Sequence, residues 1–282
     1  MAQSIIDLLN KGIEANKTDK CLHGNLIYLP SQGSLVISGD IHGHRRNFEK
    51  IKTYADLGNN PLRHLILQEI IHGGPQDEEG DCISYKTLFD AVDYKVRFPH
   101  RVHFIMGNHD TAFITDSEVM KDGKEMNRSL CAAIRREFQE DSTSIELSMC
   151  EFLMSQPLAA ICPNRIWISH SLPNTYSIDK FDPSIIDKEL QSEDLLKNGS
   201  VYLLTWGRKF SKESIQKMSE YFDADIFILA HQPQPNGWAK PYENLIIFTS
   251  DHDHGCLIEI ELSTTYTTDE IINHIRPLAS IA

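Results

Sequence analysis

Five short apolar segments of this sequence are each followed directly by residues that can bind a metal ion. The segments span residues 35–39, 64–68, 103–107, 166–169 and 226–230. In the same order, the polar residues that follow are Asp40 and His42, Glu69, Asn108 and His109, His170, and His231. Short runs of branched apolar residues are typical of buried strands. Because ligands collect beyond the carboxyl ends of strands in an open α/β sheet, the pattern predicts one transition-metal site built from histidine, carboxylate and amide groups.

The sharpest motif is Gly39-Asp40-Ile41-His42-Gly43. Asp40 and His42 are two residues apart just past a strand, so both can turn towards one metal ion. The glycines on either side let the backbone approach the ion closely.

The second motif is Gly107-Asn108-His109-Asp110. The amide oxygen of Asn108 can bind a metal, and Asp110 is a neighbouring carboxylate that can hold His109. Such a pairing fixes the tautomer of the imidazole and raises its basicity, which suits an acid that protonates a leaving oxygen.

Strand-like and helix-like segments alternate along the chain. Apolar residues at helical spacing cover residues 4–14, 46–54, 85–96 and 212–222. Strands separated by turns predict two hairpins, 25–30 with 34–39 and 157–162 with 165–170. Residues 116–155 are mostly helix-like and charged, so we expect a helical insertion beside the site. One α/β domain over residues 1–282, with helices on both sides of its sheets, accounts for this order.

The composition narrows the possible partners. The 282 residues are 41% apolar and 24% charged, as in an ordinary soluble globular protein. The formal net charge of −13 opposes binding to a phosphate backbone, so a nucleic-acid partner is disfavoured unless bound metals reverse the local potential. The apolar stretches are far shorter than a membrane span, and the N-terminus lacks a signal-peptide pattern, so we expect no membrane contact.

Cysteine usage predicts the compartment. The six cysteines are scattered and form no C-x-x-C pair; they are Cys21, Cys82, Cys131, Cys150, Cys162 and Cys256. This density is low for a disulfide scaffold, which favours reduced thiols in a cytoplasmic protein.

On these motifs the chain resembles the calcineurin-like metallophosphoesterases, a superfamily of protein phosphatases, nucleotide hydrolases and phosphodiesterases. The blocks of that superfamily run D-x-H, G-D-x-x-D, G-N-H-D/E, H and G-H, and the match spans residues 36–255. The nearer resemblance is to the bacterial and phage branch of the phosphoprotein phosphatases, which has G-D-x-H-G and a W-x-R segment, here Trp206-Gly207-Arg208. The resemblance implies a two-sheet β-sandwich flanked by helices, with two divalent metal ions at one edge.

The resemblance also implies roles for individual residues. The implied metal ligands are Asp40, His42, Glu69, Asn108, His170 and His231. His109, paired with Asp110, is the implied general acid. Asn108 also positions the substrate phosphate, and Arg208 holds it with a forked guanidinium. The alternative for Arg208 is a surface charge near the start of a helix.

The second block departs from the family pattern. Where the family has Gly-Asp-x-x-Asp-Arg-Gly, this sequence reads Gln68-Glu69-Ile70-Ile71-His72-Gly73-Gly74. Glu69 stands at the metal-bridging aspartate, His72 at the second aspartate, and Gly73 at an arginine that contacts phosphate. Either Glu69 bridges the metals and His72 acts as a further ligand or a phosphate contact, or the block has decayed and the fold is a scaffold. We favour the first, because so many buried polar groups without a metal would be costly.

The implied reaction is direct hydrolysis of phosphomonoesters, with phosphoproteins among the implied substrates. Two divalent ions ~3.5–4 Å apart bind one phosphate, and a bridging water attacks in line. Manganese is the first expectation, with iron, zinc, nickel or cobalt as alternatives. The alternative functions are a nucleotide or dinucleoside polyphosphate hydrolase, a phosphodiesterase, or a non-catalytic scaffold. The insertion at 116–155 and the loop at 233–237 are expected to select the substrate.

Asp251 and His252 follow the strand at residues 244–250. They are predicted either to line the mouth of the pocket or to accept hydrogen bonds from His170 or His231. An exposed polar turn is the alternative.

Overall fold

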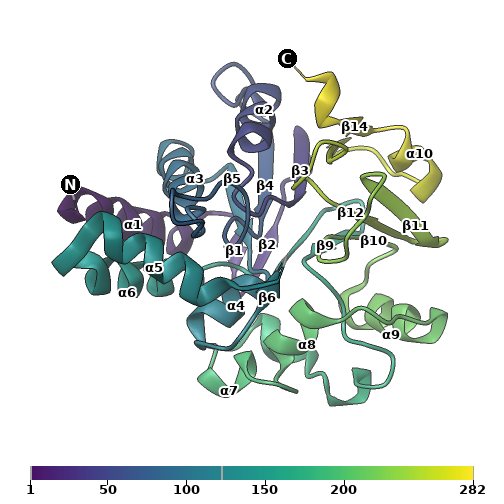
Figure 1. Ribbon diagram of the computed structural model, residues 1–282. Coiled ribbons are helices and arrows are strands. Elements are labelled where there is room, and N and C mark those ends of the chain that lie inside the picture. The colour runs from purple at the N-terminus through teal and green to yellow at the C-terminus, as the bar shows by residue number, and fades with distance from the viewer. Residues whose placement is uncertain (1, 122, 282) are drawn as a thin grey trace.

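The computed structural model describes residues 2–121 and 123–281. Two main sheets lie at its centre, with helices on the outer face of each (Figure 1). This is the predicted two-sheet sandwich flanked by helices. That residues 1–282 form a single domain stays a prediction.

The larger sheet has the strand order β1-β2-β8-β9-β10-β12-β11. Its strands are β1 (Leu22–His23), β2 (Leu26–Tyr28), β8 (Ala159–Ile161), β9 (Ile166–Ser169), β10 (Ile226–Leu229), β11 (Trp238–Tyr242) and β12 (Leu245–Phe248). Strands β9, β10 and β12 are parallel to one another, so their carboxyl ends meet at one edge.

The smaller sheet has the order β14-β13-β3-β4-β5. Its strands are β3 (Ser34–Asp40), β4 (His64–Gln68), β5 (Val102–Ile105), β13 (Cys256–Glu261) and β14 (Ile275–Pro277). Strands β3, β4 and β5 are parallel and fully buried, which explains their continuous apolar sequences.

The remaining elements are helices and one small hairpin. The helices are α1 (Ala2–Lys17), α2 (Arg45–Ala55), α3 (Tyr85–Arg97), α4 (Asn108–Ile114), α5 (Met126–Phe138), α6 (Ser142–Met154), α7 (Ser192–Leu195), α8 (Ser200–Trp206), α9 (Lys212–Phe222) and α10 (Thr268–Ile272). The hairpin pairs β6 (Met120–Lys121) with β7 (Lys124–Glu125). Short 3₁₀ turns complete the chain: η1 (Gln139–Asp141), η2 (Ile178–Lys180), η3 (Pro183–Ile186) and η4 (Leu278–Ser280).

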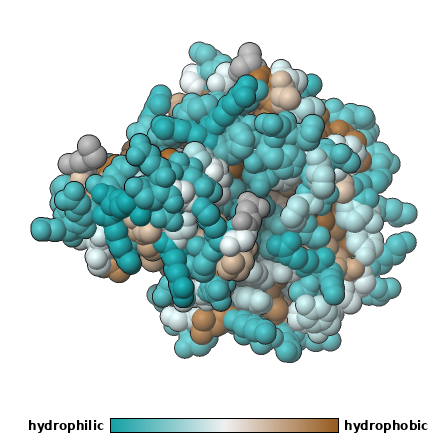
Figure 2. All heavy atoms as spheres, viewed as in Figure 1, coloured by the Kyte–Doolittle hydropathy of each residue, from teal (hydrophilic) through white to brown (hydrophobic). Residues whose placement is uncertain are grey.

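Alternate residues of each strand face different cores. Ile37 and Ile66 of the smaller sheet pack between the sheets with Ile168 and Ile228 of the larger one. The other faces of β3, β4 and β5 pack under α1, α2, α3, α5 and α6, whereas α8 and α9 cover the larger sheet. These close-packed cores hold the strand ends rigidly. On the outside, the face of the molecule drawn in Figure 2 is largely hydrophilic.

Two details differ from the sequence-based expectation. The predicted hairpin of residues 25–30 with 34–39 is wrong, because β2 joins the larger sheet and β3 the smaller one. Residues 116–155 contain the predicted helices α5 and α6, but they begin with the β6–β7 hairpin. Strands of two residues are too short to show a period in the sequence. The second predicted hairpin is confirmed by the antiparallel pair β8–β9.

None of the helices within the described ranges combines the length and apolar character that a membrane span requires. All six cysteines are free thiols.

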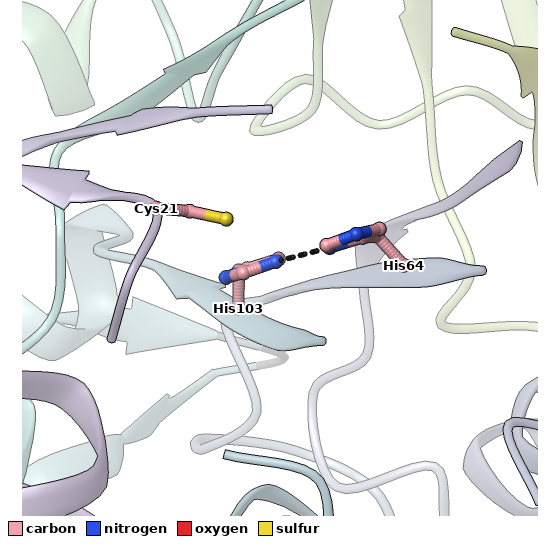
Figure 3. Close-up of side chains that lie close together, drawn as sticks. All are labelled: Cys21, His64 and His103. Atoms are coloured by element: carbon pink, nitrogen blue, oxygen red, sulfur yellow. Dashed lines mark hydrogen bonds between the residues drawn. The ribbon is translucent and has the colours of Figure 1, made fainter. Parts of the chain in front are cut away.

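A buried polar chain ties the α1–β1 loop to the smaller sheet. Lys95 Nζ donates to Asp19 Oδ2 at 2.7 Å, His103 Nδ1 contacts the same oxygen at 2.9 Å, and His103 Nε2 lies 2.9 Å from His64 Nδ1. Figure 3 shows the two imidazoles in line, with Cys21 nearby. The donor atoms of Cys21, His64 and His103 lie within 4.8 Å of one another. Hydrogen bonds already occupy both nitrogens of His103, so we assign this cluster a structural role.

The buried ion pair between Lys95 and Asp19 leads to a prediction about stability. Asp19→Asn keeps the shape of the side chain but leaves the Lys95 ammonium without its partner, at a site where both side chains are 1% exposed. Loss of one partner of a buried ion pair costs about 3 kcal/mol or more, so urea unfolding should show a drop of that size. The double variant Asp19→Asn/Lys95→Met should recover part of the loss. A change below about 1 kcal/mol in the single variant would contradict this assignment.

Candidate metal centre

Strand ends from both sheets converge on one cavity of about 570 Å³. Asp40 ends β3, Glu69 follows β4, Asn108 follows β5, and His170 and His231 follow β9 and β10. All five side chains are at least 95% buried. The structure therefore brings together the predicted ligands, with His42 on the turn after β3.

Glu69 lies at the centre of the ligand set. Its Oε2 is 3.3 Å from His42 Nε2 and 3.4 Å from His170 Nε2. Asp40 lies near both imidazoles as well, with Oδ2 3.9 Å from His42 Nε2 and Oδ1 3.5 Å from His170 Nδ1. One carboxylate oxygen therefore faces two imidazoles, as the predicted bridging role of Glu69 requires.

Asn108 lies within hydrogen-bond distance of two predicted ligands, His170 and His231. Its Oδ1 is 2.8 Å from His170 Nε2 and 2.6 Å from His231 Nδ1. An amide oxygen and two imidazole nitrogens form a donor set that divalent transition metals accept.

Several buried nitrogen atoms of the site have no hydrogen-bond partner among the described residues. Such atoms can serve as ligands of a cation. His170 Nδ1 and His231 Nε2 are both buried without one. The Ile71 carbonyl accepts from His42 Nδ1 at 3.1 Å, so His42 Nε2 directs a lone pair towards Glu69 Oε2. Either a proton on Glu69 or a cation bound to both atoms can satisfy this lone pair, and the unpartnered nitrogens of His170 and His231 can bind a cation as well. The residues present therefore fit a metal ion.

Burial governs the protonation of these groups. It raises the pKa of Asp40 to about 7, and it raises the pKa of Glu69 well above its ordinary value. Burial lowers the pKa of His42 to about 3 and keeps the pKa of His170 and His231 well below the usual range. The imidazoles are therefore neutral, which is the form that binds metal. A bound cation would displace the protons that burial places on the two carboxyl groups.

The backbone around the site is strained. The φ angles of His42, Glu69, His72 and His231 are 44°, 41°, 66° and 65°. Each costs about 1–3 kcal/mol for a residue other than glycine, and such residues cluster at functional sites. These conformations turn side chains at the strand ends towards the cavity.

Two close approaches explain how Glu69 is accommodated. A Cβ on Gly107 would lie 2.7 Å from Glu69 Oε1, so glycine makes room for the longer carboxylate. The backbone N–H of His109 donates to the same oxygen at 2.6 Å. Gln68 does not obstruct the site, because its side chain is buried and donates to the Ser38 carbonyl at 3.1 Å.

The predicted pairing of His109 with Asp110 is wrong. Asp110 Oδ2 accepts a hydrogen bond from the backbone N–H of Gly107 at 2.8 Å, so this carboxylate caps the start of α4. His109 instead faces His72, with the two Nδ1 atoms 3.0 Å apart. His72 is fully buried and does not line the cavity, so its predicted contact with the substrate is also wrong.

Arg208 is an exposed residue that lines the cavity beside His109 and Asn108. Its backbone N–H donates to Asn174 Oδ1 at 2.8 Å, which fixes the turn after α8. Trp206 anchors the same segment by donating to Thr111 Oγ1 at 3.1 Å. The backbone of Arg208 is thus fixed next to the cavity that its side chain lines.

Asp251 and His252 line the cavity mouth, as one of the two predictions for them states. Their predicted hydrogen bonds to His170 or His231 are not formed. Asp251 accepts from Thr249 Oγ1 at 2.6 Å, and His252 Nε2 contacts the Gln234 carbonyl at 3.0 Å.

Lys121 is a cavity residue that the sequence reasoning missed. It lies on β6, and its Nζ donates to Asp251 Oδ2 at 3.2 Å. A single lysine on a two-residue strand follows no motif or period, so the sequence contains no signal for it. Pro233, Gln234 and Pro235 also line the cavity, within the loop predicted to select the substrate.

The position of Glu69 predicts the effect of removing its charge. Glu69→Gln should weaken metal binding by at least the roughly 10- to 100-fold that follows loss of a residue supporting a metal ligand. Chelator competition followed by metal analysis measures this change. Glu78→Gln, on an exposed loop, is the matched control and should bind metal as the unmodified protein does. Unchanged metal affinity in Glu69→Gln would remove Glu69 from the centre.

Comparison with known proteins agrees with this geometry. A model of the calcineurin-like phosphoesterase family matches residues 33–235. The serine/threonine-protein phosphatase 4 catalytic subunit of Kluyveromyces lactis is 24% identical over 233 residues, 76% of this chain and 67% of that protein. The Saccharomyces cerevisiae subunit of the same name is 24% identical over 236 residues, with the same shares covered.

Solved structures share the fold. A serine/threonine phosphatase from Saccharomyces cerevisiae, similar to human phosphatase PP5, has a TM-score of 0.70 at 12% identity and covers 99% of this chain and 93% of its own. The cold-active protein-tyrosine phosphatase of a Shewanella species has a TM-score of 0.56 at 14% identity, and the match covers 89% of this chain and 80% of that structure's chain. The family model spans more than half of the chain, which favours an enzyme over a scaffold. The protein therefore belongs to the calcineurin-like phosphoesterase family and is a metal-dependent phosphoric ester hydrolase.

Proposed function

We propose that the protein hydrolyses phosphomonoesters, with phosphoproteins as the leading substrate class, at a centre of two divalent metal ions. The observation that carries the proposal is the position of Glu69 Oε2, which is almost equidistant from His42 Nε2 and His170 Nε2. A bridging carboxylate with a separate ligand set on each side is the arrangement that two-metal phosphoesterases need.

The resemblance to the family implies two ligand sets around Glu69. Asp40 and His42 would hold one ion, and Asn108, His170 and His231 the other, with Glu69 shared. When bound, the ions would supply the Lewis acidity that activates water and neutralises phosphoryl charge. Mixed imidazole and carboxylate ligands suit manganese, which we propose first, and also iron, zinc, nickel or cobalt.

Asn108 and Arg208 would bind the substrate phosphate. Asn108 sits on the cavity wall at the start of α4, and Arg208 lies at the mouth. A guanidinium can donate two parallel hydrogen bonds to phosphoryl oxygens, so it would both orient the phosphate and stabilise its charge in the transition state.

His109 would donate a proton to the leaving oxygen through Nε2. Its Nδ1 faces His72 Nδ1, so one of these nitrogens carries hydrogen and the other a lone pair. His72 Nε2 is buried without a partner, and a bare lone pair there costs less than an unpaired N–H. In the resting, neutral state His72 therefore donates through Nδ1 and His109 carries its hydrogen on Nε2. To act as an acid, His109 must first become an imidazolium, with a hydrogen on Nδ1 as well.

The histidine partner makes His109 a weak acid catalyst. Burial, His42 and His72 together hold the pKa of His109 well below its usual range. A neutral imidazole partner lacks the negative charge with which a carboxylate stabilises an imidazolium. We therefore expect the protein to hydrolyse aryl phosphates faster than the alkyl phosphates of phosphoserine and phosphothreonine.

The substrate class rests on two observations. The curated relatives are named as serine/threonine-protein phosphatases, and the cavity is open at a mouth lined by Pro233, Gln234 and Pro235. Nucleotides, dinucleoside polyphosphates and phosphodiesters are the alternatives. The net charge of −13 argues against nucleic acid. Six free cysteines support a reducing compartment, so we propose the cytoplasm.

The function is tested by chelating the protein and re-supplying manganese, iron, zinc, nickel, cobalt or magnesium. We expect metal-restored hydrolysis of p-nitrophenyl phosphate that exceeds hydrolysis of bis-p-nitrophenyl phosphate. Faster hydrolysis of the diester would favour a phosphodiesterase, and absence of turnover with every ion would contradict the proposal.

The His72–His109 contact gives a second prediction. An aspartate carries its carboxylate oxygen as many bonds from Cα as Nδ1 lies in histidine, so His72→Asp should place a charge against His109 Nδ1. The ratio of kcat/KM for a phosphoserine peptide to that for p-nitrophenyl phosphate should rise roughly tenfold or more, because the alkyl leaving group needs the acid. His72→Asn is the uncharged control. An equal ratio in both variants would contradict the acid assignment.

A further inference from the structure

The phosphate site lacks one of the cations expected from the family pattern. Gly73 occupies the place of the phosphate-contacting arginine, and its φ of 143° suits glycine. A Cβ on Gly73 would lie 2.8 Å from the carbonyl oxygen of His42, so the fold leaves no room for a side chain there. Of the cationic residues in the motifs, Arg208 remains.

A second cation reaches the cavity from the insertion. Lys121 lines the same cavity as Arg208, Asn108 and His109. Its β6–β7 hairpin is anchored to α5, because Met126 N–H donates to the Val119 carbonyl at 2.9 Å. The lysine is therefore positioned by regular structure rather than by a free loop.

Asp251 holds the Lys121 ammonium at the cavity wall. The Nζ–Oδ2 distance is 3.2 Å, and the two side chains are 24% and 21% exposed. An ammonium has three N–H groups, and among residues 2–121 and 123–281 its one hydrogen bond is to Asp251, so a ligand can accept from the others. Thr249 fixes Asp251 through its other oxygen, which limits the movement of the ion pair.

Lys121 shares the cavity with the predicted metal ligands. Asp40, Glu69 and Lys121 all line it. A phosphate bound at the metal ligands therefore lies in the space that the Lys121 side chain borders.

We propose that Lys121 is a phosphate-binding residue that replaces the missing arginine and contacts a phosphoryl oxygen together with Arg208. The inference rests on the proposed phosphomonoesterase site and identifies its preferred ligand as a phosphate dianion. A diester carries one charge fewer, so it gains less from a second cation. The insertion thus contributes a residue to the site and does more than cover it.

The direct test is calorimetric binding of inorganic phosphate to the manganese-loaded protein. Lys121→Met removes the charge while keeping most of the apolar stem, and phosphate affinity should fall roughly 10- to 100-fold, as for loss of a charge-assisted hydrogen bond. Lys124→Met is the matched control, because that lysine lies on the same hairpin but contacts Gln76. The control should bind phosphate as the unmodified protein does.

A double variant separates phosphate binding from simple neutralisation of Asp251. If Lys121 served only to balance that carboxylate, Lys121→Met/Asp251→Asn would restore phosphate affinity. We expect affinity to stay low, because the ligand contact is still missing. Full restoration, or phosphate affinity in Lys121→Met equal to that of the unmodified protein, would overturn the proposal.

Kinetics distinguish this inference from the proposed function. Lys121→Met should lower kcat/KM for p-nitrophenyl phosphate several times more than for bis-p-nitrophenyl phosphate, and Lys121→Arg should recover most of the loss. If the protein binds phosphate through Lys121 but hydrolyses neither ester, the proposed function fails and this inference stands. If both esters lose equally and phosphate affinity is unchanged, the inference fails while the function stands.

Discussion

The structure depends on a group of buried imidazole, amide and carboxyl groups that are fully satisfied only when a cation lies among them. His42 Nε2 and Glu69 Oε2 lie 3.3 Å apart, and both side chains are buried. Burial leaves the imidazoles neutral and the carboxyl groups hard to ionise, and buried atoms such as His231 Nε2 have no partner. Each unsatisfied buried group costs about 1–3 kcal/mol, so one centre of positive charge relieves several costs at once.

The two-sheet scaffold makes this crowding possible. Parallel strands in each sheet end at one shared edge, and Gly39 lets β3 approach β12 so closely that a Cβ there would lie 2.6 Å from the Phe248 carbonyl. Strained turns then direct the side chains inward. A cavity lined by so many rigid strand ends is suited to binding a small charged group. The hairpin that carries Lys121 and the loop after His231 can determine which substrate is bound.

The strand ends and their ligands could be predicted from the sequence because buried parallel strands give continuous apolar runs and the ligands follow them directly. The direction of side chains within tight turns could not be predicted from the sequence. Asp110 adjoins His109 in the chain, yet the start of α4 turns its carboxylate back to Gly107. His72 reaches His109 through a left-handed turn that residue order does not reveal. Lys121 lies on a strand too short to show a period, and the pairing of Asp19 with Lys95 joins distant parts of the chain.

The most direct test of the central claim is a crystal structure of the manganese-loaded protein, with anomalous scattering recorded at the manganese absorption edge. We predict two anomalous peaks, one on each side of the Glu69 carboxylate, with Asp40 and His42 at one peak and Asn108, His170 and His231 at the other. A single peak, or two peaks that Glu69 does not bridge, would contradict this prediction.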